Sequence, residues 1–271
     1  MLKQHVSKRG NSIKLMGIVN VTPDSFSDGG KFMHTQTAVK QALQLLAEGA
    51  ACIDIGGESS RPGAANVSET EELRRVLPVI KALRRQTKTL ISIDTYKPNV
   101  AAAALQAGAN CVNDITGLAD QAMRQLIAKT GCPVVLMHMQ GTPRTMQKRP
   151  YYKDVVRDIC DFFTERLALA RSADIARKQI ILDPGIGFGK SVKHNLEIIR
   201  RLGEFKKFRL PILVGASRKS FIGKLTSADV TQRLPGTLAA HNSAVQNGAT
   251  WLRVHDVAAH KQYLMISHEL T

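Results

Sequence analysis

The chain has 271 residues, which falls within the usual size of a single α/β barrel domain. Hydrophobic residues make up 44% and aromatic residues only 5%, a composition that suits a core of valine, isoleucine, leucine and alanine. The formal net charge is +16, yet the sequence has no basic arm with interleaved aromatic residues and no helix-turn-helix or zinc-finger signature. We therefore expect a solvated basic surface and no nucleic-acid partner.

The sequence contains four cysteines, and none belongs to a CxxC pair or has a histidine nearby at zinc-ligand spacing. Three of them lie in or beside apolar runs, where buried free thiols are expected instead of disulfides or a structural zinc. No apolar stretch approaches membrane-spanning length, and residues 1–10 lack an apolar targeting core. These features predict a soluble, cytoplasmic protein with no membrane partner.

Eight short apolar runs each end in polar residues that a buried strand has no packing reason to carry. The runs cover residues 15–19, 51–55, 90–93, 111–112, 134–137, 180–182, 212–214 and 251–254. Helix-period segments lie between them, at residues 68–83, 99–107, 120–129, 154–171, 195–202 and 237–246. This alternation, without a break in composition, predicts an α/β fold of the (β/α)8 TIM barrel type as a single domain over residues 1–271. A doubly wound open sheet is the alternative.

Cationic side chains follow three of the strand ends. Arg253 and His255 lie two residues apart and therefore project from the same face of the eighth strand. Arg61 and Lys219 lie in the connections after the second and seventh strands, and loops after the last two barrel strands often bind phosphate. The set predicts a site for a polyanion such as pyrophosphate. Asn20, at the end of the first strand, could give a carbonyl oxygen to Mg²⁺.

Acidic and amide side chains end the third, fourth and sixth strands. They are Asp94, Asn113 and Asp183. An ionised carboxylate in a barrel mouth is costly unless strong donors reach it, and a ring with an N–C–NH2 edge offers two parallel donors. Helix capping is the alternative role for either aspartate.

The sequence also contains two long connections and two near-matches to known motifs. Residues 21–35 and 56–67 are rich in glycine, serine and proline, and we expect them to act as mobile lids at the barrel mouth. Residues 184–191 resemble a P-loop, but proline replaces its first glycine. Residues 215–219 resemble a nucleophile elbow that ends in lysine instead of glycine. Kinase and serine hydrolase activities are therefore disfavoured.

The polar strand endings together resemble those of bacterial dihydropteroate synthases, in order and over essentially the whole chain. The matching segments are residues 20–30, 56–63, 92–95, 113–115, 183–189, 217–220 and 253–255. The resemblance implies a barrel enzyme that joins 6-hydroxymethyl-7,8-dihydropterin pyrophosphate to p-aminobenzoate. The products would be 7,8-dihydropteroate, for folate biosynthesis, and pyrophosphate. It further implies a monofunctional homodimeric transferase that uses Mg²⁺ and is a target of sulfonamides.

The resemblance also assigns roles to individual residues. The pterin would be held by Asp94, Asn113, Asp183 and Lys219, with Met137 packed against its ring. Arg61, Arg253 and His255 would bind pyrophosphate, and Asn20 the magnesium ion. Phe188 and Ser220 would line the aminobenzoate site, with Phe26 and Asp28 on the first lid. His138 receives no role.

Ser60 departs from the family pattern, which has threonine at this position of the second lid. The hydroxyl group is kept and a methyl group is lost, so we expect catalysis to survive. The change bears instead on packing against aminobenzoate and against the sulfonamides that mimic it.

The chemistry implied by this resemblance predicts a dissociative displacement without a covalent enzyme intermediate. Aminobenzoate is a weak nucleophile, so catalysis must help pyrophosphate to leave. We expect Asp94, Lys219, Arg253 and His255 to be catalytic, with Asp94 favouring the cationic methylene electrostatically.

Two other classes stay open. A pterin-binding methyltransferase domain would share the barrel and its acidic contacts, but it has no need of four cationic residues around a diphosphate. A non-enzymatic nucleic-acid binder is motivated by the net charge alone.

Overall fold

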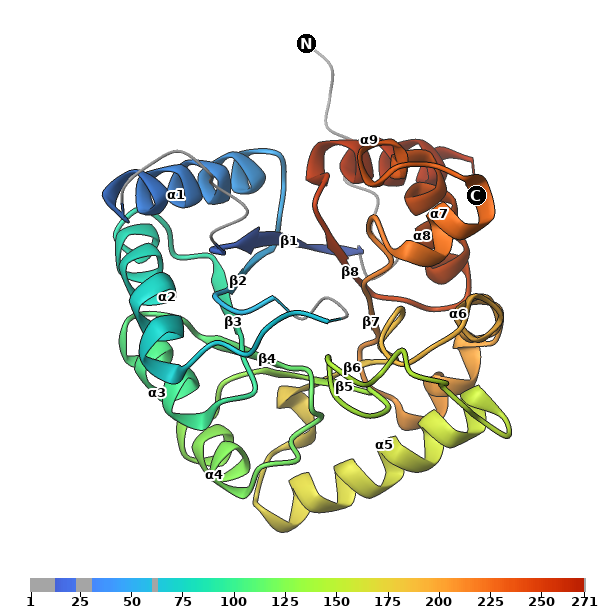
Figure 1. Cartoon of the computed structure of the whole chain (residues 1–271), viewed down its shortest axis with the longest axis horizontal. Helices are drawn as coiled ribbons and strands as arrows, with labels where there is room; N and C mark the ends of the chain where they lie inside the picture. Colours follow the sequence, from blue (N-terminus) through green and yellow to red (C-terminus); the bar gives the residue numbers. More distant parts are fainter. Residues whose placement is uncertain (1–12, 23–30, 60–62, 271) are drawn as a thin grey trace.

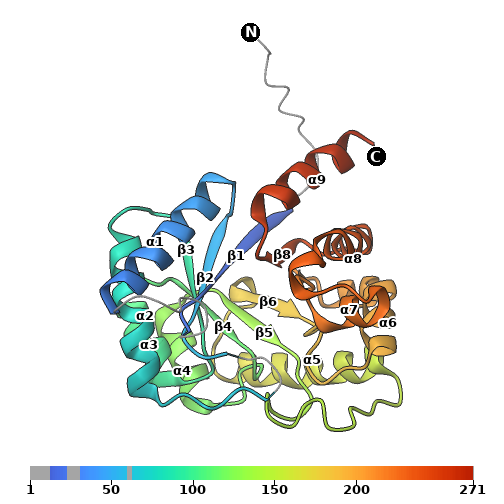
Figure 2. The ribbon, with the colours of Figure 1, turned by 45° about the horizontal axis from the view of Figure 1, so that its top comes forward.

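Eight parallel strands form a barrel with helices arranged around its outside (Figures 1 and 2). The computed structural model describes residues 13–22, 31–59 and 63–270. The strands are β1 (Lys14–Asn20), β2 (Cys52–Gly56), β3 (Leu90–Asp94), β4 (Cys111–Asp114), β5 (Val134–Met137), β6 (Ile180–Asp183), β7 (Leu213–Val214) and β8 (Trp251–Val254). Their order is β6-β5-β4-β3-β2-β1-β8-β7, and a bridge between Leu182 and Ile212 closes the ring. The barrel prediction is confirmed, and the open sheet is excluded.

The helices form the outer layer that Figure 1 shows encircling the strands. They are α1 (Lys31–Ala47), α2 (Glu69–Arg84), α3 (Pro98–Gln106), α4 (Gln121–Thr130), α5 (Val155–Ser172), α6 (Val192–Arg200), α7 (Ser220–Thr226), α8 (Leu234–Gln246) and α9 (Val257–Glu269). Short polar side chains begin several of them, because a side-chain oxygen accepts hydrogen bonds from amides of the first turn. Asp120 does so for α4, and Asp154 for α5.

Several boundaries differ from the sequence prediction, and α8, expected to begin at residue 237, begins at Leu234. The helix expected at residues 195–202 is α6 and begins at Val192, because the hydroxyl of Ser191 accepts a hydrogen bond from the His194 amide. A 3-10 helix then runs from Leu202 to Phe208 and includes Gly203. The first long connection is also shorter than predicted, since α1 already begins at Lys31.

Alternation of side chains along the strands divides the core into two parts. Outward-facing residues such as Ile53, Ile93 and Leu136 pack against the helices. Inside the barrel, a second apolar cluster comes mostly from the starts of the strands: Met16, Cys52, Val135, Ile181, Leu213 and Trp251. Most inward positions nearer the carboxyl ends are polar or charged, such as Asp94, Asn113 and Asp183, and Met137 is an apolar exception. The apolar cluster therefore seals one end of the barrel and leaves the other for chemistry.

The cysteines and the membrane prediction can be compared with this fold. All four cysteines lie among the described residues, are buried and carry free thiols, and burial was predicted for three of them. Within residues 13–22, 31–59 and 63–270, we find no helix whose length and apolar character would let it cross a bilayer.

Two glycines share nearly the same left-handed backbone conformation but differ in the space that a Cβ atom would have. Gly131, which ends α4, and Gly185, after β6, have φ of 68° and 69°. A Cβ atom on Gly185 would lie 1.9 Å from the carbonyl oxygen of His138, whereas nothing lies within 4 Å of one on Gly131. We expect Gly131→Ala to lower the free energy of unfolding by about 1 kcal/mol and Gly185→Ala by about 3 kcal/mol. Denaturant unfolding measures both, and equal losses would contradict the importance of the close approach.

Candidate active site

The guanidinium group of Arg253 lies between two carboxylates inside the barrel mouth. Its Nε donates to Oδ2 of Asp54 at 2.6 Å, and its Nη2 donates to Oδ2 of Asp94 at 2.7 Å. The amide nitrogen of Asn113 donates to the same Asp54 oxygen at 3.0 Å. Asp54 is fully buried, whereas the Arg253 side chain keeps 18% of its exposure. This network joins strands β2, β3, β4 and β8.

Asp54 is a functional candidate that the sequence prediction missed. It lies in the middle of β2, where its register partners are Ile18 on β1 and Ser92 on β3. The signal was present, because an aspartate within an otherwise apolar strand must find a donor when its side chain points inward. Its partner Arg253 lies 199 residues away in sequence, so no local pattern could identify the pair.

Burial shifts the two mouth aspartates toward neutral pKa values. It raises the pKa of Asp94 to about 7, against the opposing charge of Arg253 and with a further contribution from Asp54. It raises the pKa of Asp183 to about 6, against a hydrogen bond from the Gly185 amide at 2.7 Å and the charge of Lys219. The ionisation of both carboxyls therefore depends on nearby cations and donors.

One pocket collects most of the residues predicted from the strand endings. It is lined by Asp94, Asn113, Ile115, Met137, Asp183, Gly185, Ile186, Phe188, Gly215, Lys219 and Arg253. The Nζ atom of Lys219 lies 4.1 Å from the centre of the Phe188 ring. Acceptor oxygens thus stand beside apolar walls and two cations. Such a pocket suits a flat heterocycle with a donor-rich edge and an anionic substituent.

His255 lies beside this pocket and is held by Ser217. The Ser217 hydroxyl accepts a hydrogen bond from the His255 backbone amide at 3.2 Å and lies 3.0 Å from Nδ1. This geometry suits a hydrogen bond from the hydroxyl proton to Nδ1, and in that tautomer Nε2 carries the ring proton. Burial lowers the pKa of His255 to about 4, with contributions from the charges of Arg253 and Arg218. His255 is thus a neutral hydrogen-bond donor at physiological pH.

The remaining predicted residues do not line this pocket, and some of them lie outside the described residues. Asn20 is half-buried, and a Cβ atom on Gly56 would lie 3.8 Å from its Oδ1 and 3.6 Å from Oδ2 of Asp94. Ser220, the first residue of α7, is exposed and does not line the pocket. Four predicted residues lie outside the described residues: Phe26, Asp28, Ser60 and Arg61.

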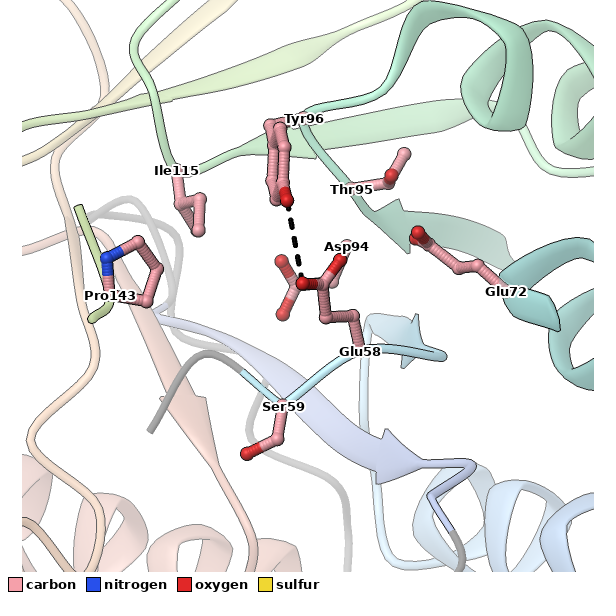
Figure 3. Close-up of a pocket in the computed structure, with 8 residues that line it drawn as sticks. All are labelled: Glu58, Ser59, Glu72, Asp94, Thr95, Tyr96, Ile115 and Pro143. Atoms are coloured by element: carbon pink, nitrogen blue, oxygen red, sulfur yellow. Dashed lines mark hydrogen bonds between the residues drawn. The ribbon is translucent and has the colours of Figure 1, made fainter. Parts of the chain in front are cut away.

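A second pocket adjoins the first and shares Asp94 and Ile115 with it (Figure 3). The hydroxyl of Tyr96 points at Glu58 and donates to its Oε1 at 3.4 Å. Behind this contact, Lys97 donates to Glu58 at 2.5 Å and to Glu72 at 2.6 Å. The sequence prediction missed these charged residues, which tie the connection after β2 to α2 and to the residues just before α3.

The pocket and the fold define a pterin-binding barrel enzyme. A family model described as pterin binding enzyme matches residues 16–255. A dihydropteroate synthase of Escherichia coli is 49% identical over 243 residues, which cover 90% of this chain and 86% of that protein. A dihydropteroate synthase of Synechocystis is 46% identical and covers 96% of this chain and 91% of its own length.

Solved structures agree with these relatives. A Xanthomonas albilineans dihydropteroate synthase with 4-aminobenzoic acid has a TM-score of 0.90 at 45% identity, covering 96% of this chain and 93% of that one. A Yersinia pestis enzyme in a sulfonamide complex has a TM-score of 0.91 at 44% identity, covering 99% and 98%. A further X. albilineans structure, with 7,8-dihydropteroate, has a TM-score of 0.87 at 43% identity, covering 96% and 94%. The chain therefore belongs to the dihydropteroate synthases, which are transferases.

The buried network makes a prediction about stability. Asp54→Asn would replace the carboxylate that accepts from both Arg253 and Asn113 with a neutral amide. Arg253 would then keep a single charged partner, Asp94. We expect the free energy of unfolding to fall by about 3 kcal/mol, as when one partner of a buried ion pair is removed. The same substitution at the exposed Asp161 on α5 is the control and should cost less than about 0.5 kcal/mol. A loss below about 1 kcal/mol at Asp54 would refute the structural importance of the pair.

Proposed function

We propose that this protein joins 6-hydroxymethyl-7,8-dihydropterin pyrophosphate to p-aminobenzoate and releases 7,8-dihydropteroate and pyrophosphate in folate biosynthesis. The observation that carries the proposal is the pocket in which acceptor groups, apolar walls and two cations converge. The relatives whose structures contain 4-aminobenzoic acid, 7,8-dihydropteroate and a sulfonamide support this choice of substrates.

In the proposed complex, the pterin occupies the pocket between Met137 and Phe188. The carboxylate of Asp183 accepts two hydrogen bonds from the N–C–NH2 edge of the ring. Asn113 and Asp94 accept from other ring donors, and Lys219 donates to the ring. The geometry favours this arrangement because Oδ1 of Asn113 has no hydrogen-bond partner among the described residues, while its amide nitrogen is already used by Asp54.

Cations surround the diphosphate in this proposal. Arg253, His255 and Arg61 bind its oxygens, and His255 donates from Nε2 when its Nδ1 accepts from the Ser217 hydroxyl. Among the described residues, no group of three or more histidine, cysteine or acidic side chains could hold a metal ion alone. Asn20 would hold Mg²⁺ through its side-chain oxygen, as one ligand among others that phosphate oxygens and water could supply. When bound, that ion would neutralise charge on the diphosphate.

The aminobenzoate site lies toward the open side of the pocket. Phe188 and Ser220 line it in this proposal, together with Ser60, and Phe26 and Asp28 belong to the segment that covers it. Sulfonamides would occupy the same site.

The reaction proceeds by dissociative displacement. The carbon–oxygen bond to the diphosphate breaks first, and the pair of electrons leaves with the pyrophosphate, whose charge Arg253 and Lys219 stabilise. The methylene carbon left on the pterin is cationic, and the negative charge of Asp94 favours it. The amine of p-aminobenzoate then attacks this carbon and loses a proton. Covalent trapping of a pterin on the protein during turnover would contradict this sequence of steps.

Three further properties belong to the proposal. We expect one functional domain across residues 1–271, a homodimer in solution and a cytoplasmic location. These follow from the family's general features and from the reducing environment suggested by four free, buried thiols.

Pyrophosphate release with purified protein tests the activity directly. We expect sustained release only when the pterin diphosphate, p-aminobenzoate and Mg²⁺ are all present. 7,8-Dihydropteroate should appear in equal amount, as chromatography would measure. Release at the full rate without p-aminobenzoate, or no release in the complete mixture, would overturn the assignment.

Two substitutions test the placement of the pterin. Asp183→Ala and Lys219→Ala should each weaken binding of the pterin diphosphate by about 100-fold, because each removes charge-assisted hydrogen bonds. Titration calorimetry measures the change, and Lys224→Ala, at an exposed lysine on α7, is the matched control. Unchanged affinity in both pocket variants would place the pterin elsewhere.

A further inference from the structure

Lys190 and His138 form a buried pair behind the pocket that the proposed reaction does not use. Lys190 ends the P-loop-like segment and is only 3% exposed. Its Nζ atom lies 3.0 Å from Nδ1 of His138, 2.9 Å from the carbonyl oxygen of Phe188 and 3.4 Å from that of His138. The lysine of this segment therefore turns back under the loop instead of reaching toward a phosphate.

These contacts suit a protonated lysine. An ammonium group has three donors, and three acceptors surround it. Burial lowers the pKa of His138 to about 2, aided by the charge of Lys190, so the ring is neutral and Nδ1 can accept. A neutral amine has only two N–H groups and would leave one acceptor unmatched. Burial lowers the pKa of Lys190 to about 7, against the opposing charge of Asp183 and with a further contribution from the charge of Lys219.

Asp183 is an acidic group whose charge raises the pKa of Lys190. Its Oδ1 accepts the hydrogen bond from the Gly185 amide, and a Cβ atom on Gly185 would lie 3.4 Å from Nζ of Lys190. The ion pairs of the described residues include none with Lys190, so its charge acts on Asp183 through space.

We propose that Lys190 is a positioning residue of the pterin site, whose buried ammonium keeps Asp183 ionised and holds the Phe188 backbone behind the pocket. This inference rests on the proposed function, in which the Asp183 carboxylate accepts two hydrogen bonds from the pterin edge. Lys190 touches no substrate in this arrangement and acts through Asp183 and Phe188.

The other charges that face Asp183 explain why a third cation is needed. Lys219 and Arg253 face it from the pocket side, and Lys190 faces it from behind. In the proposed complex, Lys219 and Arg253 also serve the leaving diphosphate, which offsets their charge. Lys190 is shut away from the pocket, so its effect on Asp183 does not change when the diphosphate binds or leaves. Lys219 and His194 are the other titratable groups whose charge couples to that of Lys190.

The pH dependence of pterin binding tests the proposal. The probe is 6-hydroxymethyl-7,8-dihydropterin without a diphosphate, because phosphate groups titrate in the same range. In the unaltered protein, affinity should fall as pH drops through about 6, where Asp183 becomes protonated. Lys190→Met should move this midpoint upward by about one unit, so that affinity falls roughly tenfold at pH 6 and recovers at pH 9.

The matched control is Lys193→Met, which removes the charge of an exposed lysine three residues away on α6. Its midpoint should stay at the value of the unaltered protein, because solvent screens an exposed charge. A Lys190→Met profile with an unmoved midpoint and the same loss at every pH would overturn the proposal, since a wall that is merely disturbed gives that result.

A double-mutant cycle, measured by denaturant unfolding, tests the same coupling even if Lys190→Met destabilises the fold. Adding Asp183→Asn to Lys190→Met should restore much of the lost denaturant midpoint at pH 6.5, where Asp183 is mostly ionised and Lys190 mostly protonated in the folded protein, because the carboxylate stranded without its cation is removed. At pH 5, where Asp183 is protonated in the folded protein, the two substitutions should have additive effects. Additive effects at both pH values would refute the coupling. This cycle needs no ligand, so it separates failure of the inference from failure of the proposed function.

Discussion

The arrangement of the barrel mouth depends on one buried cation held between two carboxylates. Arg253 cannot lie so deep without compensation, and Asp54 and Asp94 provide it from two neighbouring strands. Because the Asp54 oxygen that binds Arg253 also accepts from Asn113, the contact fixes which way that amide faces. The oxygen of Asn113 is left as an acceptor. The pocket therefore presents acceptors from its acidic and amide residues together, which is why it favours a ring whose edge is rich in donors.

The apolar cluster at the other end of the barrel gives this network its strength. Met16, Trp251 and their neighbours fill the interior near the strand starts, so apolar side chains underlie the charged residues of the mouth. The same burial raises the pKa values of Asp94 and Asp183 to about 7 and 6. Because these pKa values lie near neutral pH, the nearby cations decide how far the two carboxyls are ionised. Packing at the sealed end thus sets the electrostatics at the open end.

Sequence reasoning succeeded where a residue's role follows from its position along a strand. Polar residues after buried strands must gather at one mouth of a parallel barrel, so Asp94, Asn113, Asp183 and Arg253 could be predicted to meet. Sequence reasoning failed where a residue's role depends on a partner from another strand. Asp54 looked like part of an apolar run, and Lys190 like part of a failed phosphate loop, because their partners are distant in sequence or lie on another strand end. Ser191 was missed for a smaller reason, since one capping hydroxyl moved a helix start by three residues.

The charges of the site divide into those that face the substrate and those that support them from behind. Lys219 and His255 stand at the pocket or beside it, while Asp54 and Lys190 lie beneath and behind it. In the proposed reaction, negative charge departs with the pyrophosphate and positive charge stays on the pterin methylene. The supporting charges do not move with either product, because Asp54 remains bound to Arg253 and Lys190 remains bound to the Phe188 carbonyl. The pterin end of the pocket can therefore keep its hydrogen-bonding pattern while the charge at the diphosphate end changes.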